Sequence, residues 1–469
     1  MNTPKYRLLI TVLALTVLSA CRIGKDYHRP ALELPETLGQ ASADTGSVAN
    51  FSWKTFFTDP QLQALIARGL ERNHDLLTAL KRTDIAWQQL KQARALMLPT
   101  ANLNVSAQYT RPSDNSLAGL STQAFLGRDY LENYQAGVNL SWEADIWGRI
   151  GRMKEAARAE YVQTDEGAKA VRTLLVSNIA QGYLNLLMLD EQLEIARQNL
   201  SLSDSFLLAT RQLMAAGMTN DLAVQQAQSR QQTTAMLLSQ VEEAIVIQEN
   251  ALRQLTGDLP GPVARGRLDQ FSIPHQLTTG LPVALVSRRP DVRSRELALV
   301  SANARIGAAK AAMYPALNIT AGTGLESFKS SNWFDIPGSV FGLAAGAVAQ
   351  PLLQRRTLKT RLETAKLERD QREIEFKQSV LQATTEVANA LTRIEKLQER
   401  ETLAAARAGS MQTAVSQSQL LFRSGMADYL DVITVHSNAL QSQLDLSAIR
   451  REELGAVVEL YRALGGGWK

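Results

Sequence analysis

The stretch IAQGYLNLLMLDEQLEIARQNLSLSDSFL, residues 179–207, decides the fold. Within it, large apolar residues recur every seven positions, and mostly small residues recur three places after them. The first set is Ile179, Leu186, Leu193, Leu200 and Leu207, and the second is Gly182, Leu189, Ala196 and Ser203. Two such positions in every seven residues form the seam of a coiled coil. The stretch therefore predicts a long helix that packs against neighbouring helices.

The seam returns later in the chain. Val387 and Ile394 stand 208 residues after Ile179 and Leu186. This repeat argues for one elongated body built twice rather than for several globular domains. Aromatic residues make up only 6% of the 469 residues, which suits long helices better than a large globular core. The net charge of +4 is small, so we expect no nucleic-acid partner.

Both copies of the seam end at similar turns, GMTNDL at 217–222 and GMADYL at 425–430. Glycine suits a helix C-cap, and the Asn or Asp that follows suits the N-cap of a returning helix. We therefore expect helical hairpins at about 151–257 and 355–465. Each includes a helix of about 60 residues, which spans about 90 Å.

The N-terminus has the pattern of an exported lipoprotein. Lys5 and Arg7 precede an apolar run over 8–18 that is too short for a stable membrane span, and the chain's single cysteine, Cys21, follows. We expect Cys21 to be lipidated after removal of a signal peptide at 1–20; the alternative is an ordinary secretory leader with an incidental cysteine. By resemblance to known lipoproteins, Arg22 rather than Asp after the cysteine favours the outer membrane.

Two segments of each repeat have the period of a strand. Apolar and polar residues alternate over about 101–110 and 131–143, and again over about 315–326. A fourth strand, about 339–350, lacks clean alternation and is expected from its place in the repeat. A polar loop from Arg111 to Asp129 joins the first two.

Such alternation fits either a sheet half buried on a soluble core or a transmembrane barrel with an apolar outside. Strands of about ten residues, with long loops at one end and long helices at the other, favour the barrel. Four strands cannot close a barrel, because about eight are the practical minimum. Several chains must then contribute strands. Two chains would give a barrel filled by side chains, and three would give twelve strands around a lumen.

Several motifs in order resemble the outer-membrane factor (TolC-like) family, specifically the NodT-type lipoprotein branch of tripartite efflux systems. They are the lipobox at Cys21, Asp26-Tyr27-His28-Arg29-Pro30, Trp53 with Asp59-Pro60, the stretch LVSRRPDVR at 285–293, GMADYLDV at 425–432 and LGGGW at 464–468. The resemblance implies a homotrimer in which twelve strands and a helical barrel form a passive duct. It also implies a periplasmic adaptor and a proton-driven inner-membrane pump as partners, besides outer-membrane lipid.

The resemblance further implies a gate at the periplasmic end, just after the second turn. By position, this gate comprises Leu430, Asp431 and Thr434, with Asp428 near the tip. The alternative is that Asp428 is a helix N-cap and Asp431 is simply solvated. Thr434 departs from the family, which often has Asp there. The second strand–helix junction also lacks the paired glycines of relatives, so we expect its bend to be built differently.

The turns themselves are expected, by the same resemblance, to dock the adaptor. The residues concerned are Gly217, Met218, Leu222, Gly425 and Met426. Their alternative role is simple packing of the helix turn.

Other signals favour structural roles. The histidines are scattered, without the spacing of a metal site, and no nucleophile, base and orienting acid stand together, so we expect no metal, no cofactor and no enzyme activity. The arginines at 288–295 are expected to be a solvated helix start; the alternative is that they contact a partner or anionic groups. Trp142, Trp147 and Trp333 are expected either in an interfacial belt or packed at the junctions.

We therefore expect a mainly α chain with a membrane β-barrel. The expected organisation is a signal peptide at 1–20, a lipidated arm at 21–60, a first repeat at 61–257, a linker at 258–284 and a second repeat at 285–469. The expected function is an outer-membrane efflux duct for small molecules such as drugs or other toxic compounds. The alternatives are a conduit for secreted proteins or peptides and a non-conducting periplasmic scaffold.

Overall fold

The computed structural model describes residues 23–32, 51–273 and 288–468. The expected signal peptide, Cys21, much of the arm and residues 274–284 of the linker lie outside the described residues. The chain divides into two compact units. Unit 1 is Met1–Pro30, Asp84–Val162 and Glu296–Ile374, and unit 2 is Ala31–Thr83, Gln163–Arg295 and Glu375–Lys469. Each unit takes segments from both sequence repeats.

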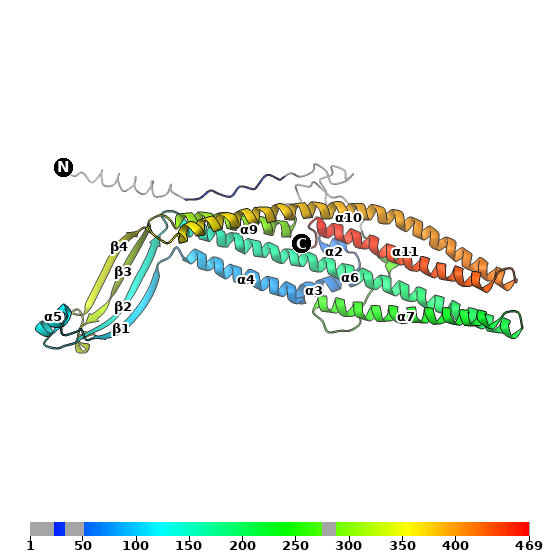
Figure 1. The fold of residues 1–469 in the computed structure, drawn as a ribbon, viewed down its shortest axis with the longest axis horizontal. Coiled ribbons are helices and arrows are strands. Elements are labelled where there is room, and N and C mark those ends of the chain that lie inside the picture. Colours follow the sequence, from blue (N-terminus) through cyan, green and yellow to red (C-terminus); the bar gives the residue numbers. More distant parts are fainter. Residues whose placement is uncertain (1–22, 33–50, 274–287, 469) are drawn as a thin grey trace. The chain divides into compact units, whose positions relative to one another are not determined.

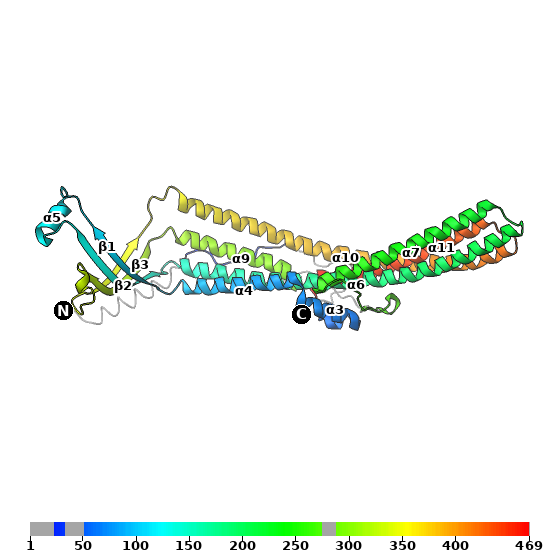
Figure 2. The same cartoon turned by 90° about the horizontal axis from the view of Figure 1, so that it is seen from below.

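The two predicted hairpins are present and nearly identical in size (Figures 1 and 2). Helix α6, Arg149–Ala215, returns as α7, Asp221–Thr256, and α10, Thr357–Arg423, returns as α11, Tyr429–Ala463. Both α6 and α10 have 67 residues, or about 100 Å at the usual rise. The remaining α-helices are α2, Trp53–Phe56, α3, Pro60–Arg72, α4, His74–Ala95, α5, Leu117–Leu126, and α9, Pro290–Ala311. Within the described ranges, no helix is both long and apolar enough to cross a membrane.

Four antiparallel strands form one sheet in the order β1-β2-β3-β4. They are β1, Thr100–Thr110, β2, Leu131–Ala144, β3, Ala316–Ser327, and β4, Val340–Ala349. The central pair joins the two repeats, because β2 comes from the first and β3 from the second. The predicted fold class, mainly α with four strands, is confirmed.

The expectation of a plain polar loop between the first two strands was wrong. This segment contains helix α5, whose N-cap is Ser116 and whose C-cap is Gly127 at φ 63°. The Ser116 hydroxyl accepts a hydrogen bond from the Gly119 amide at 3.1 Å. Leu117 and Phe125 are exposed on this helix, so its sequence is also less polar than a solvated loop.

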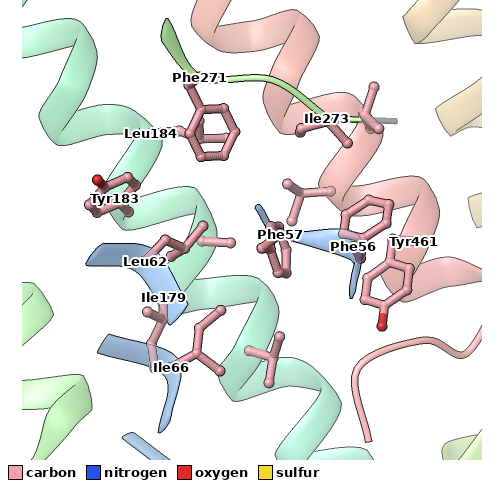
Figure 3. Packing of buried hydrophobic residues seen from close by; sticks show 14 of the residues in the cluster. Phe56, Phe57, Leu62, Ile66, Ile179, Tyr183, Leu184, Phe271, Ile273 and Tyr461 are labelled. Carbon is pink, nitrogen blue, oxygen red and sulfur yellow. The ribbon is translucent and has the colours of Figure 1, made fainter. Parts of the chain in front are cut away.

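The hydrophobic core of unit 2 surrounds the middle of α6 (Figure 3). Ile179 and Leu186 of the predicted seam are fully buried. The arm docks there: Phe56 and Phe57 are fully buried, and the Phe56 ring stacks on Tyr461 of α11 with centroids 4.0 Å apart. The arm and the C-terminal helix are therefore parts of one core.

Close helix approach explains one small residue in the seam. A Cβ atom added at Gly182 would lie 2.9 Å from the Leu252 side chain of α7. The Gly182 carbonyl oxygen accepts a hydrogen bond from Gln248 at 3.1 Å. A larger residue would push the two helices of the hairpin apart.

Candidate functional site

The outer strands β1 and β4 expose nearly all of their side chains, on both faces of the sheet. One face carries Leu103 and Val138, which lie opposite each other, and the other carries Asn102 opposite Asn139. Leu103 is 74% exposed, although it belongs to the apolar face. An apolar sheet face of this size left in water is unfavourable, so something apolar must cover it.

The sheet also has two free edges. Within the described residues, β1 pairs with β2 and β4 pairs with β3, which leaves the outer edge of each end strand unpaired. Edge strands of 11 and 10 residues present a row of open amides and carbonyls. Both edges are therefore ready to pair with strands of another chain.

The first strand–helix junction is built around Asp145. Its carboxylate accepts hydrogen bonds from the amides of Ile150 at 2.8 Å and Gly151 at 2.7 Å, which satisfies the open amides at the start of α6. Gly148, at φ 73°, makes the bend. Arg149 is held by Glu143 through two hydrogen bonds, at 2.9 and 2.6 Å.

The second junction is built differently, as predicted. Arg355 and Arg356 adopt φ angles of 43° and 68°, in the left-handed region. Residues with a Cβ atom rarely occupy this region, and each costs about 1–2 kcal/mol there. The junction thus achieves its bend with two strained arginines where glycine would bend freely.

The arm is fixed to unit 1 immediately after the lipobox. The Ile23 amide donates to the carbonyl of Trp147, which lies between β2 and α6, at 3.1 Å. Arg152, only 2% exposed, forms an ion pair with Asp26 at 3.0 Å and donates to the Gly24 carbonyl at 3.1 Å. These contacts hold the residues that follow Cys21 against the strand–helix junction.

A second clamp holds the Asp26–Pro30 motif. Arg29 donates two hydrogen bonds to Glu296 of α9, at 2.7 and 2.8 Å, and Tyr27 donates to the same carboxylate at 3.3 Å. Burial, followed by the charge of Glu296, raises the pKa of the Tyr27 hydroxyl. The motif therefore acts as an attachment of the arm.

The two turns expose apolar side chains. Gly217 and Gly425 share φ 73°, as expected of helix C-caps. Met218 and Met426 are 75% and 76% exposed, and Leu222 and Leu430 are also exposed. The exposed methionines and leucines of the two turns form an apolar surface that a partner molecule could cover. Such a surface fits the docking role predicted from the sequence.

The expected gate residues form the start of α11. Asp428 and Asp431 make a capping box: the Asp431 carboxylate accepts from the Asp428 amide at 3.1 Å, and Asp428 caps the Tyr429 amide at 2.6 Å. The Thr434 hydroxyl donates to the Leu430 carbonyl at 2.8 Å. Asp431 therefore caps the helix and is still exposed to solvent. The gate role of these residues stays a prediction.

His436 is buried on α11, two residues after Thr434 in the sequence. His436 contacts Gln419, with 3.2 Å between the Gln419 amide and the ring nitrogen, and packs near the Phe206 ring. Burial and the positive charge of Arg230 lower its pKa. His436 is therefore neutral near pH 7.

The expectation that the arginines at 288–295 are simply a solvated helix start was wrong for Arg289. Its side chain is 3% exposed. It bridges Asp291 at 2.6 Å and Glu386 of α10 at 2.8 Å, and it donates to the Ala463 carbonyl at 3.1 Å. Arg462 also contacts Glu386, at 3.1 Å. This buried charge cluster (Arg289, Asp291, Glu386 and Arg462) joins three helices, α9, α10 and α11, in unit 2.

The three tryptophans pack at junctions and at the loop end of the sheet. The Trp142 ring nitrogen donates to the Met97 carbonyl at 2.9 Å, and that of Trp147 donates to the Pro315 carbonyl at 2.7 Å. Trp333 packs against the Tyr134 ring. Their predicted place in an interfacial belt stays a prediction.

In the described part of the chain, no group of three or more His, Cys, Asp or Glu side chains is placed to hold a metal ion. The candidate functional features among the described residues are surfaces: two open sheet edges, an apolar sheet face and two exposed turns.

Comparison with known proteins agrees with these features. The family model "Outer membrane efflux protein" matches residues 65–258 and 281–466. The chain is 29% identical over 461 residues to the cation efflux system protein CusC of Escherichia coli O6:H1, covering 96% of this chain and 97% of that protein. It is also 29% identical over 481 residues to the toluene efflux pump outer membrane protein TtgF of Pseudomonas putida, covering 97% and 96%.

A solved structure agrees at the level of the whole chain. The open state of the Neisseria gonorrhoeae MtrE outer membrane channel superposes with a TM-score of 0.85 at 26% identity. The match covers 96% of this chain and 99% of that one.

Proposed function

Because the chain belongs to the outer membrane efflux protein family, we propose that three copies assemble into the duct of a tripartite efflux pump. The protein is an efflux channel of the outer membrane that extends into the periplasm. The three-chain assembly, its partners and its cargo class are our proposal.

The unpaired edges of β1 and β4 are the observation that best supports a three-chain assembly. Four strands per chain cannot seal a barrel, whereas three chains supply twelve, enough to enclose a lumen. Pairing β1 of one copy with β4 of the next satisfies both edges at once. The apolar face then meets lipid and the face with Asn102 and Asn139 lines water, which is the alternation of a membrane barrel.

The arm clamps support lipid anchoring at Cys21. Arg152 of α6 and Glu296 of α9 hold residues 24–29, and the Ile23 amide bonds to the Trp147 carbonyl just past β2. The chain is thus fixed beside a strand–helix junction from the second residue after Cys21 in the sequence. The anchor and the strands would then enter the same membrane.

The exposed turns support docking to a periplasmic adaptor. Met218 and Met426 belong to the two hairpins, so both hairpins would take part in the interface. An inner-membrane pump would supply the energy for transport. The gate of the duct would be Leu430, Asp431 and Thr434, beside Asp428.

The cargo is proposed to be small molecules. Two relatives of equal 29% identity are named for cations and for toluene, so no single compound class is carried over to this chain. A passive duct selects weakly, and the choice of cargo lies upstream in the pump.

Planar-bilayer recording tests the duct. We expect purified, acylated protein to give discrete conductance steps, and the Asp431→Ala/Thr434→Ala variant to open more often because its gate residues are truncated. A protein that inserts into the bilayer but conducts in neither form contradicts the duct and supports the scaffold alternative.

A further inference from the structure

Unit 1 contains a cavity of about 1090 Å³ at the ends of four helices. Helices α4, α6, α9 and α10 run side by side there as one layer (Figures 1 and 2), and all four line the cavity. A single cavity can touch four neighbouring helices only if the layer curves around it. The cavity therefore lies on the concave side of the layer.

The cavity has an excess of positive charge. Its lining includes four arginines, Arg149, Arg305, Arg355 and Arg361, and two glutamates, Glu160 and Glu368. Arg149 is paired with Glu143, and Arg305 is paired with Glu160. Two of the four arginines are thus neutralised within the chain.

Arg355 and Arg361 remain without a carboxylate partner among the described residues. Both are exposed at the start of α10. Glu368 lies seven residues beyond Arg361, about 10 Å along the helix. Two guanidinium groups therefore face the cavity next to the strand–helix junction, with the nearest lining carboxylate on α10 about two turns away.

The backbone gives a second, independent observation. Arg355 and its neighbour Arg356 occupy the left-handed region at the bend, where glycine would be free of strain. Strain of this kind clusters at functional sites, so it marks the bend as a whole, and the cavity lining separates Arg355 from Arg356. The strained Arg355 is also one of the two unpaired arginines of the cavity.

We propose that Arg355 and Arg361 form a positive collar inside the duct, which binds the anionic groups of passing molecules such as carboxylates and phosphates. This inference rests on the proposed three-chain duct, because the concave sides of three layers face a common axis. Guanidinium groups bind carboxylate and phosphate oxygens through paired hydrogen bonds. The collar would favour anions at the junction, whereas Asp428 and Asp431 carry acidic groups at the turn.

Reversal potentials across a bilayer of phosphatidylcholine, under a gradient of KCl, test the collar. We expect Arg355→Gly/Arg361→Gln to lower the ratio of chloride to potassium permeability about fivefold. Arg355→Lys/Arg361→Lys keeps both charges and should keep most of the selectivity. The glycine at 355 also relieves strain, so the fold should survive.

Arg356→Gly/Lys359→Gln is the matched control. It removes two positive charges from the same segment and relieves the same kind of strain, but neither residue lines the cavity. We expect its permeability ratio to equal that of the wild type. Equal shifts in the two double variants, or an unmoved ratio in Arg355→Gly/Arg361→Gln, would overturn the collar.

Two further outcomes separate the alternatives. A shift that occurs only in bilayers containing phosphatidylglycerol assigns the arginines to lipid headgroups and overturns the collar. Absence of conductance in the wild type overturns the duct and the collar together, whereas conduction with unmoved selectivity overturns the collar alone.

Discussion

Replacing Arg289 by methionine is expected to lower the free energy of unfolding by about 3 kcal/mol. The substitution keeps an apolar stem. It leaves Glu386 with Arg462 as its one remaining ion-pair partner among the described residues, and it removes the guanidinium donor of the Ala463 carbonyl. Both groups belong to helices that meet in unit 2, so their loss of partners weakens the contact of α9 with α10 and α11. Thermal unfolding followed by circular dichroism measures the effect.

Arg288→Met is the matched control. Arg288 is half buried, and the described residues provide it with no carboxylate partner. We expect Arg288→Met to unfold near the wild-type temperature. Equal unfolding temperatures for the two variants would contradict the assigned role of the buried charge cluster.

The loss in Arg289→Met should depend on pH. Burial raises the pKa of the Glu386 carboxyl, but the charges of Arg289 and Arg462 outweigh burial and hold it below its ordinary value of 4.5. Arg289 likewise holds the pKa of the Asp291 carboxyl below its ordinary value, against the effect of burial. A carboxyl whose pKa is lower in the folded protein than in the unfolded one stabilises the fold at pH values above its unfolded pKa. This stabilisation is lost as the pH falls through the pKa of the folded protein. The difference in the free energy of unfolding between wild type and Arg289→Met should therefore be largest at pH 7 and should shrink below about pH 4.5.

Placing aspartate at both turns, Met218→Asp/Met426→Asp, is expected to abolish efflux. Full burial of one methionine contributes about 1.5–3 kcal/mol, so losing two should weaken adaptor binding about a hundredfold or more. The side chains are 75% and 76% exposed in the chain, so folding and membrane insertion should be unaffected. The test uses a strain from which the gene for this protein has been deleted and which carries the variant instead. Its growth on the compounds to which the deletion confers sensitivity measures the loss of efflux.

Phe125→Asp is the control for introducing a charge at an exposed apolar residue. Phe125 lies on α5, in the loop between β1 and β2, and is 87% exposed. This variant should restore growth as the wild type does. Full efflux by Met218→Asp/Met426→Asp would remove the turns from the docking surface.

Periodicity predicted the elements of the fold because it is a local property. The seam at Ile179 and Leu186 reflects packing along one helix, and alternation over 101–110 reflects the two faces of one strand. The twin glycine turns were readable for the same reason. The α5 helix was missed, although Ser116 and Gly127 carried its cap signals.

The charge clusters could not be predicted in this way. Arg289 and Glu386 are 97 residues apart, and Arg29 and Glu296 are 267 apart. A run of arginines beside a proline resembles a solvated helix start in any short window, and only the tertiary fold buries one of them. The bend at Arg355 and Arg356 was expected to differ from glycine-built bends, but its left-handed backbone required coordinates.

The central claim is that the free edges of β1 and β4 are completed by further copies of the same chain. Native mass spectrometry of the acylated protein in detergent measures the number of copies directly. We expect a complex of three chains, since three chains supply twelve strands around a lumen. A protein that remains a single chain, or that forms a dimer, under conditions in which it still conducts would contradict it.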